Sequence, residues 1–288
     1  MRIATWNVNS LRARIDRTLA VLERWDLDVL AIQETKCRDE QFPVGAFADA
    51  GYEVAHTGLN QWNGVAIASR VGLTDVATSF PGQPGFLKPE PGGHGDQDAE
   101  LPAASAPSAP LLDLEPPPEA RAIGATCGGV RVWSLYVPHG RALDDPHYRY
   151  KLGWLERLRD AARGWAAEEG AQVALLGDWN VIPRDTDVYD VADFAGKTHV
   201  SPLERAAFEA FAPAGYTEVT REHVPAEHTY TYWDYQRLAF PRNKGLRIDF
   251  AWTTSTVAQR VRGVWIDREE RKGKGASDHV PVVLELAD

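Results

Sequence analysis

Polar side chains stand repeatedly at the ends of apolar, strand-like runs of this 288-residue sequence. Each belongs to a type that can bind a metal ion, move a proton or donate a hydrogen bond: Asn7 after IATW, Glu34 after VLAIQ, Tyr136 within WSLYVP, Asp178 and Asn180 after ALLG, Asp249 within LRIDF, and the pair Asp278-His279 before PVVLEL. Strand ends are rigid platforms, and functional residues commonly sit on loops and ends that such platforms hold. Six placements of one kind therefore favour a shared site.

Taken singly, each of these residues has an equally good structural explanation. Asx side chains often bond nearby backbone or form turns, and charged neighbours can pair at the surface or in the core. The structural alternatives are backbone bonding by Asn7, a surface pair of Glu34 with Lys36 or Arg38, a turn at Asp178-Trp179-Asn180, a buried pair of Asp249 with Arg247 or Arg242, and a turn cap at Asp278 beside a surface His279. The joint occurrence of all six favours chemistry.

The chemistry that suits these residue types is narrow. Carboxylates and an amide carbonyl are hard oxygen ligands, which suit Mg²⁺ and not Zn²⁺. The sequence has only two cysteines, Cys37 and Cys127, and lacks the zinc-protease, serine-hydrolase and P-loop motifs. What remains is a metal-assisted attack of water on a phosphodiester, which requires a cation, a base, and donors for the charge on the phosphorus oxygens.

The elements that must position these residues can be read from hydrophobic periodicity. A helix is indicated where Ile15, Leu19 and Leu22 recur, and others over about 147–169 and 202–212. The second of these opens with a capping box, Ser201 with Glu204. The predicted strands are RIATWNV, DVLAIQE, YEVAHT, GVAIAS, VRVWSLYV, QVALLGD, RIDFAWT, VRGVWI and PVVLEL. Many strands with interspersed helices predict two packed sheets covered by helices.

Composition places the chain among globular proteins, with 44% hydrophobic and 25% charged residues. No apolar run is long enough to span a membrane, and the start MRIATWNVNS lacks the features of a secretory signal. Two distant cysteines make no disulfide framework. We therefore expect a protein of the reducing cytoplasm.

Charge and proline are distributed unevenly along the chain. Residues 82–120 hold nine of the nineteen prolines, and one lysine against seven acidic residues. Such a composition predicts a flexible insertion within one domain, although a linker that separates residues 1–81 from the rest is the alternative. Residues 237–275 hold ten Lys and Arg against four acidic residues, whereas the net charge of the chain is −10. This balance disfavours avid coating of DNA and allows a transient, site-directed contact.

Eight motifs together carry a family resemblance: TWNVNSLRAR, AIQETKC, LYVPHG, LLGDWNV, THVSPLERAAF, YTYWDY, NKGLRIDF and SDHVPV. In this order, from residue 5 to residue 282, the sequence resembles the exonuclease III family of apurinic/apyrimidinic (AP) endonucleases, within the endonuclease/exonuclease/phosphatase superfamily. QETK, WxDY and GLRID are the elements most specific to its DNA-repair branch. The resemblance implies a four-layer α/β sandwich, two packed mixed β-sheets flanked by helices, in one catalytic domain over residues 1–288.

The resemblance also implies a role for each candidate residue. The metal ligands would be Glu34, with Asn7 beside it and Asp278 nearby. Asp178 would orient and deprotonate the attacking water, and Asn180 would hold a phosphate oxygen and that water. His279 would donate to the phosphate with Asp249 fixing its imidazole, which is physically sensible because a buried carboxylate supports the charged form of a histidine. Tyr136 would bond the phosphate or act as a phenolate.

The loop TYTYWDYQRLAFPRNKG is both aromatic and basic. Tyr232, Trp233 and Phe240 could line a pocket for an extruded abasic sugar, or could form the core of the loop. The basic residues that would then contact backbone phosphates are Arg237, Arg242, Lys244 and Arg247. The motif YVPHG places His139 where the family usually has Asn or Gln, so a phosphate contact that weakens as the pH rises through neutrality is expected.

The expected activity is that of a DNA phosphodiesterase of base-excision repair, with Mg²⁺ as cofactor and Mn²⁺ as a substitute. It would incise duplex DNA 5′ to abasic sites, leave a 3′-hydroxyl, and process blocked 3′ ends as a 3′-5′ exonuclease, as a cytoplasmic monomer that associates with the nucleoid on DNA. The alternatives are a phosphodiesterase of the same fold that acts on a phosphoinositide or sphingolipid, and a catalytically silent DNA-binding protein.

Overall fold

The computed structural model describes residues 1–86 and 116–288. Most of the predicted insertion, residues 87–115, therefore lies outside the described residues. The two described ends of that segment lie side by side: Gly85 forms an antiparallel bridge with Pro118, and the Gln83 side chain donates to the Glu119 carbonyl at 2.9 Å. The assignment of the whole chain to one catalytic domain stays a prediction.

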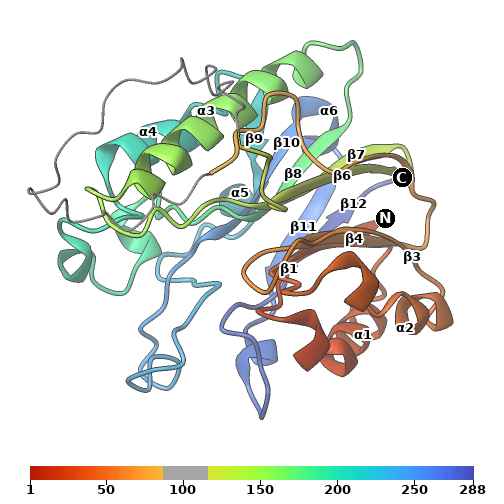
Figure 1. Cartoon of the computed structure of the whole chain (residues 1–288), viewed down its shortest axis with the longest axis horizontal. Coiled ribbons are helices and arrows are strands. Elements are labelled where there is room, and N and C mark those ends of the chain that lie inside the picture. The colour runs from red at the N-terminus through yellow and green to blue at the C-terminus, as the bar shows by residue number, and fades with distance from the viewer. Residues whose placement is uncertain (87–115) are drawn as a thin grey trace, which may run out of the picture.

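Two six-stranded mixed sheets form the centre of the molecule, as predicted (Figure 1). The first sheet has the order β11 (Val261–Ile266), β12 (Val282–Leu286), β1 (Arg2–Asn7), β2 (Val29–Gln33), β4 (Val65–Ser69) and β3 (Glu53–Thr57). The second has the order β5 (Thr74–Ala77), β6 (Ala122–Cys127), β7 (Val130–Tyr136), β8 (Val173–Asp178), β10 (Asp249–Thr254) and β9 (Tyr216–Glu218). Each sheet has one parallel pair, β1 with β2 and β7 with β8, and its other pairs are antiparallel.

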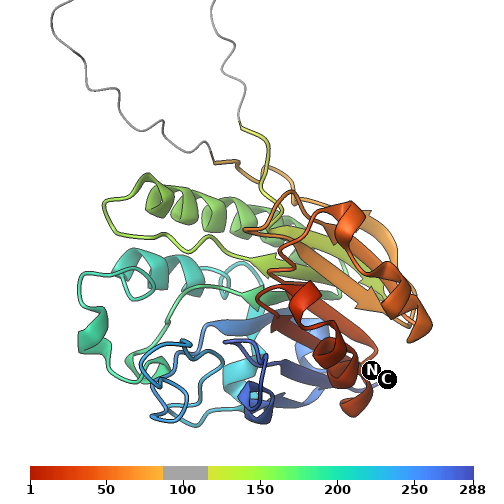
Figure 2. The same cartoon turned by 60° about the horizontal axis from the view of Figure 1, so that its bottom comes forward.

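Helices cover the outer faces of both sheets, which gives the four layers that the resemblance implied (Figure 2). The helices α1 (Ile15–Arg24) and α2 (Val44–Asp49) lie on the first sheet, and α3 (Pro146–Ala166) and α4 (Pro202–Glu209) lie on the second. Shorter helices are α5 (Val219–His223) and α6 (Ser255–Ala258), and 3₁₀ turns lie at Leu11–Ala13, Asp39–Gln41, Asp185–Asp187, Val191–Phe194 and Arg268–Arg271. Among the described residues, no helix has the length and apolarity that a membrane crossing requires.

Strand alternation explains how the buried faces are filled. On β1, Ile3 belongs to the core between the two sheets, whereas Ala4 and Trp6 face the layer of α1 and α2. On β8, Ala174 and Leu176 likewise face the first sheet. The same period of two places the last residues of these strands, which are polar, on the faces that meet between the sheets.

Local sequence signals account for the two helices that lie behind the second sheet. The capping box of α4 is confirmed: the Ser201 hydroxyl accepts from the Glu204 amide at 3.2 Å, and the Glu204 carboxylate accepts from the Ser201 amide. Asp145 caps α3, whose first residue is Pro146. The strands β5, β6 and β9 and the helices α2, α5 and α6 were not predicted, because these elements are short or weakly periodic.

Candidate active site

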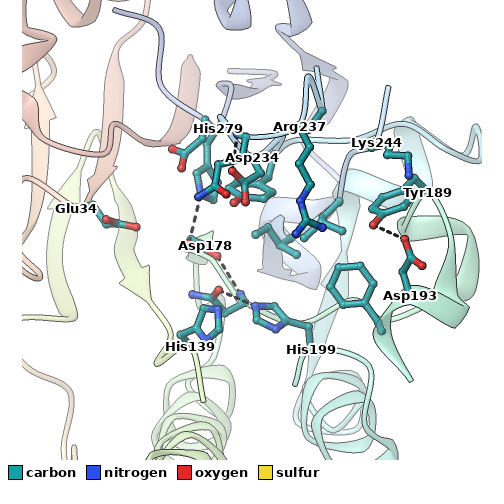
Figure 3. Close-up of a pocket in the computed structure, with 18 of the residues that line it drawn as sticks. Glu34, His139, Asp178, Tyr189, Asp193, His199, Asp234, Arg237, Lys244 and His279 are labelled. Atoms are coloured by element: carbon teal, nitrogen blue, oxygen red, sulfur yellow. Dashed lines mark hydrogen bonds and ion pairs between the residues drawn. The ribbon is translucent and has the colours of Figure 1, made fainter. Parts of the chain in front are cut away.

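Several candidate residues, among them Glu34, Asp178 and His279, face one cavity (Figure 3). β1 and β2 are parallel, and so are β7 and β8, and the contact of Asn7 with Asp178 across the two sheets brings the ends of the two pairs to the same rim. Asn7 ends β1 and Asp178 ends β8, and Glu34 directly follows β2. Glu34 and Asn180 adopt the left-handed backbone region, with φ of 52° and 50°, which is uncommon for non-glycine residues.

Asp249 reaches the same rim from the opposite direction. The sequence placed it at the end of a strand, but it is the first residue of β10, which runs antiparallel to β8 and pairs Asp249 with Asp178. The prediction about the strand end was wrong, because the strand begins at Asp249 and the apolar residues that precede it are not part of it. His279 arrives in the same way, since it precedes β12, which is antiparallel to β1.

A network of short contacts joins the carboxylates. The Asn7 amide nitrogen donates to Glu34 Oε1 at 2.8 Å and to Asp178 Oδ2 at 3.0 Å. The other oxygen of Asp178 accepts from the Asn180 backbone amide at 2.9 Å. Burial raises the pKa of Asp178 to about 7, with further contributions from the charges of Asp249 and Glu34. Asp178 is thus a carboxylate whose proton affinity suits a general base at neutral pH.

His279 is held between two carboxylates. Its Nδ1 lies 2.9 Å from Asp249 Oδ2, and its Nε2 lies 3.7 Å from Asp178 Oδ2. Burial alone would lower the pKa of His279, but the charges of Asp249 and Asp178 outweigh it and raise the pKa to about 10. The imidazole is therefore protonated at neutral pH and directs a charged N–H toward Asp178.

Tyr136 and Glu34 face each other across the two sheets. Burial, followed by the negative charge of Glu34, raises the pKa of Tyr136 well above its usual value, so its neutral hydroxyl favours a donor role over a phenolate. For Glu34, burial would raise the pKa, but the charge of Lys36 and the amide of Asn7 lower it. The Lys36 ammonium lies 2.8 Å from Glu34 Oε2. Glu34 is consequently an ionised ligand beside a neutral phenol.

The donor set fits a hard divalent cation. Among the described residues, Glu34, Asp178 and His279 offer ligand atoms that all lie within 4.8 Å of one another. The two carboxylates are of the kind that Mg²⁺ prefers, whereas the protonated His279 is a donor and not a ligand. Asn7 turns its amide nitrogen to the carboxylates, while its oxygen accepts from the Asn9 amide at 3.0 Å. In this conformation Asn7 orients the ligands and does not present an oxygen to the metal.

Asp278, the third predicted metal ligand, lines the same cavity but lies outside this cluster. Its Oδ1 accepts from the Asn9 side chain at 3.1 Å and from the Ser277 hydroxyl at 3.3 Å. Asp278 therefore holds the loop that carries His279.

A cavity of about 600 Å³ opens from the carboxylates. The predicted residues that line it are Glu34, Tyr136, His139, Asp178, Asn180, Tyr232, Arg237, Arg242, Lys244, Asp278 and His279. Tyr232 lies against the His279 ring, with centroids 4.9 Å apart, and a bridge pairs the two residues. The cavity thus has polar chemistry at one end and a basic loop along its wall.

Three of the predicted substrate-binding residues are placed differently. Trp233 is 1% exposed and packs edge-on against Phe240, at 5.2 Å between centroids, and neither lines the cavity. Arg247 is fully buried and donates to the carbonyls of Thr220 and Val224 at 2.9 Å. The prediction that Arg247 contacts a phosphate is wrong in this structure, because its guanidinium holds α5 against the sheet. Trp233 and Phe240 form the core of the loop.

Two neutral histidines line the cavity beside Asn180. Burial, followed by the charge of Lys151, lowers the pKa of His139 to about 4, so the expected change of its charge near neutrality is wrong. His199 stacks edge-on against His139, with centroids 4.5 Å apart, and its Nε2 lies 3.0 Å from Asn180 Oδ1. Burial lowers the pKa of His199 well below its usual value.

Sequence reasoning did not identify nine of the lining residues: Tyr189, Asp193, Phe194, His199, Asp234, Gln236, Ala239, Leu246 and Ile248. The hydroxyl of Tyr189 donates to Asp193 at 2.7 Å at the far end of the cavity (Figure 3). His199 stands inside the motif THVSPLERAAF, which was noted without this residue being selected. Its φ of 79° marks an unusual backbone conformation, which the sequence does not reveal.

Comparisons with known proteins agree with this geometry. The model of the endonuclease/exonuclease/phosphatase family matches residues 4–279. Exodeoxyribonuclease III of Haemophilus influenzae is 26% identical over 99% of this chain and 100% of its own length. The structure of a 3′-5′ exonuclease (NExo) from Neisseria meningitidis is 33% identical, with full coverage of both chains and a TM-score of 0.85. An AP endonuclease structure from Archaeoglobus fulgidus is 30% identical over 99% of both chains, with a TM-score of 0.82.

Proposed function

This chain belongs to the exonuclease III family of the endonuclease/exonuclease/phosphatase superfamily, and we propose that it is a Mg²⁺-dependent DNA repair nuclease. It incises duplex DNA 5′ to abasic sites to leave a 3′-hydroxyl, and it processes 3′ ends. The observation that supports this proposal is the joint presence of a carboxylate–histidine centre and a basic-walled cavity. The known relatives carry the names of an exodeoxyribonuclease III, a 3′-5′ exonuclease and an AP endonuclease.

We assign a separate role in the reaction to each residue of the site. Glu34 would hold the cation, with Mn²⁺ as a substitute, and the cation would supply charge neutralisation at the phosphate oxygens. Asp178 takes the proton of the attacking water. With its pKa raised to about 7, the basic form of Asp178 increases as the pH rises through that value. Asn180 holds the water and a phosphate oxygen.

Donors on both sides of the scissile phosphate stabilise its developing charge. His279 supplies a charged N–H whose direction Asp249 fixes through the 2.9 Å contact, and Tyr136 supplies a neutral O–H. Arg237, Arg242 and Lys244 line the cavity wall and contact the DNA backbone, which sets the register of the strand. The protein acts as a monomer on cytoplasmic DNA.

The lipid alternative is less well supported. The relatives named above are an exodeoxyribonuclease, a 3′-5′ exonuclease and an AP endonuclease, and these names point to DNA rather than to a lipid substrate. A catalytically silent DNA-binding protein would not require a carboxylate whose pKa is raised to about 7 beside a charged imidazole.

Cleavage of a labelled duplex with one abasic-site analogue, beside an intact duplex and one with a 3′-phosphate, tests the proposal. Each is incubated with Mg²⁺, with Mn²⁺ and with a chelator. We expect metal-dependent incision at the abasic site and removal of the 3′-phosphate. Attack on the 3′ ends alone would remove abasic incision from the proposal, and cleavage in the chelator would refute the metal dependence. No cleavage of any substrate would refute the proposed function.

A further inference from the structure

Behind the cavity, one buried ion pair joins α3 to α4. Lys151 of α3 and Glu204 of α4 have side chains that are both 0% exposed, and the Lys151 ammonium contacts Glu204 Oε1. Among the described residues, no other Lys/Arg–Asp/Glu pair has both side chains fully buried. Burying two charges is unfavourable, and a well-packed apolar pair of similar volume often gives equal stability. The pair therefore calls for a role other than stabilisation.

The contacts of this pair reach three residues of the cavity wall. The ammonium donates to the Asn180 carbonyl at 2.6 Å and to the His139 carbonyl at 3.3 Å. Glu204 Oε1 also accepts from the His199 backbone amide at 2.8 Å. His139, Asn180 and His199 come from three separate loops, and each lines the cavity. With Glu204 as the third acceptor, all three donors of the ammonium are used.

The aliphatic part of Lys151 also fits closely against the loop that follows His139. A Cβ added at Gly140 would lie 3.2 Å from Lys151 Cδ and 3.2 Å from a methyl carbon of Thr198, and Gly140 has a φ of +92°. The loop therefore passes over the lysine with a backbone that only glycine adopts readily. The position of the loop is thus set by both the stem and the head of the lysine.

We propose that Lys151 and Glu204 are positioning residues, which set the spacing of His139, Asn180 and His199 for the reacting phosphate. The inference rests on the proposed function of the site. The side chain of Asn180 is held in turn by His199, at 3.0 Å between Oδ1 and Nε2, and donates to the Val137 carbonyl at 2.9 Å. Displacement of the pair would therefore shift the backbone and the side chain of Asn180 together. A displacement of about 1 Å at such a group costs about 10²-fold in rate.

The test compares Lys151→Met with the double variant Lys151→Met/Glu204→Gln. The single variant leaves a buried, unpaired carboxylate and loses stability, whereas the double variant removes both charges and regains much of it. We expect kcat on the substrate that the wild type cleaves to fall about 10²-fold in both, with little change in KM. A double variant that regains both stability and kcat would overturn the proposal, because the pair would then be purely structural. If the single variant does not fold, the kcat and the stability of the double variant test the proposal by themselves.

Arg221→Met is the matched control. Arg221 pairs with Asp187, whose side chain is 1% exposed, and neither residue lines the cavity. This variant should lose stability and keep kcat. Amide hydrogen exchange provides a measure that does not depend on activity: exchange at Gly140 and Asn180 should accelerate in the double variant and not in Arg221→Met. Unchanged exchange would overturn the positioning role even if the wild type did not cleave DNA, a result that would refute only the proposed function.

Discussion

The two ends of the cavity are built in different ways. At one end, Asp178 and Asp249 belong to paired strands, are at most 2% exposed, and contact their partners directly. At the other end, Tyr189 and Arg237 stand on irregular segments, and Arg237 and Leu238 have positive φ angles. The strand-borne end is rigid and can hold reacting groups in place, whereas the loop-borne wall can adapt to a DNA backbone. The difference indicates that catalysis and recognition are separable by mutation.

The strongest challenge to this separation is Asp178→Asn. The amide retains the shape of the carboxylate and cannot accept the water proton, so kcat should fall by about 10²–10⁴-fold while DNA affinity is retained. Single-turnover rates together with binding isotherms provide the measurement. Asp193→Asn is the matched control, since Asp193 lines the far end of the same cavity and its loss should change kcat far less. Equal losses in the two variants would abolish the distinction between the ends.

The Asp249→Asn variant should lose activity by about 10²-fold, because His279 would lose its orientation and the charge that supports its protonated form. In the wild type the pKa of His279 is raised to about 10, so the imidazolium is present below that pH and is lost as the pH rises through it. Removal of the Asp249 carboxylate lowers this pKa. The decline of kcat at high pH should therefore begin at a lower pH in the variant, and a coincident profile would contradict the assignment.

Tyr136→Phe sharpens the comparison within the rigid end. A hydrogen bond to a charged group contributes about 1.5–3 kcal/mol, so kcat should fall about 10–100-fold. The pKa of Tyr136 is raised well above its usual value, so the wild-type profile should show no ionisation of this phenol near neutral pH. If the reaction depended on a phenolate, kcat of the wild type would instead rise with pH. That rise would be absent in the variant.

The smallest effects are expected from two arginines, Arg237 of the cavity wall and the buried Arg247. Arg237→Ala should weaken DNA binding and reduce the slope of log affinity against log salt by about one, with kcat nearly unchanged. Arg247→Met should leave that slope unchanged and lower the free energy of unfolding by about 1–3 kcal/mol, since it deprives two buried carbonyls of their donor. Salt titrations and denaturant unfolding distinguish them, and a changed salt slope in Arg247→Met would be contrary to its burial.

The same contrast explains what the sequence could predict. Asn7 and Asp178 were identifiable because the apolar alternation of β1 and β8 determines the face on which each strand ends. The start of β10 depends on its pairing with β8, so Asp249 was assigned to the wrong end of the strand. In the loop and the residues after it, the composition showed aromatic and basic residues but could not show that Trp233 and Arg247 are buried. His199 was missed because its position depends on contacts with Glu204 and Asn180 that form only in the folded chain.

The order of the strands has a consequence for the newly made protein. β12 is inserted between β1 and β11, and His279 lies just before it. During synthesis, which adds about 5–20 residues per second, Glu34 and Asp178 leave the ribosome well before His279 does. A nascent chain thus carries the carboxylates without the imidazole and without the strand that fills the first sheet. The candidate active site is therefore assembled only after the segment that carries His279 has been made.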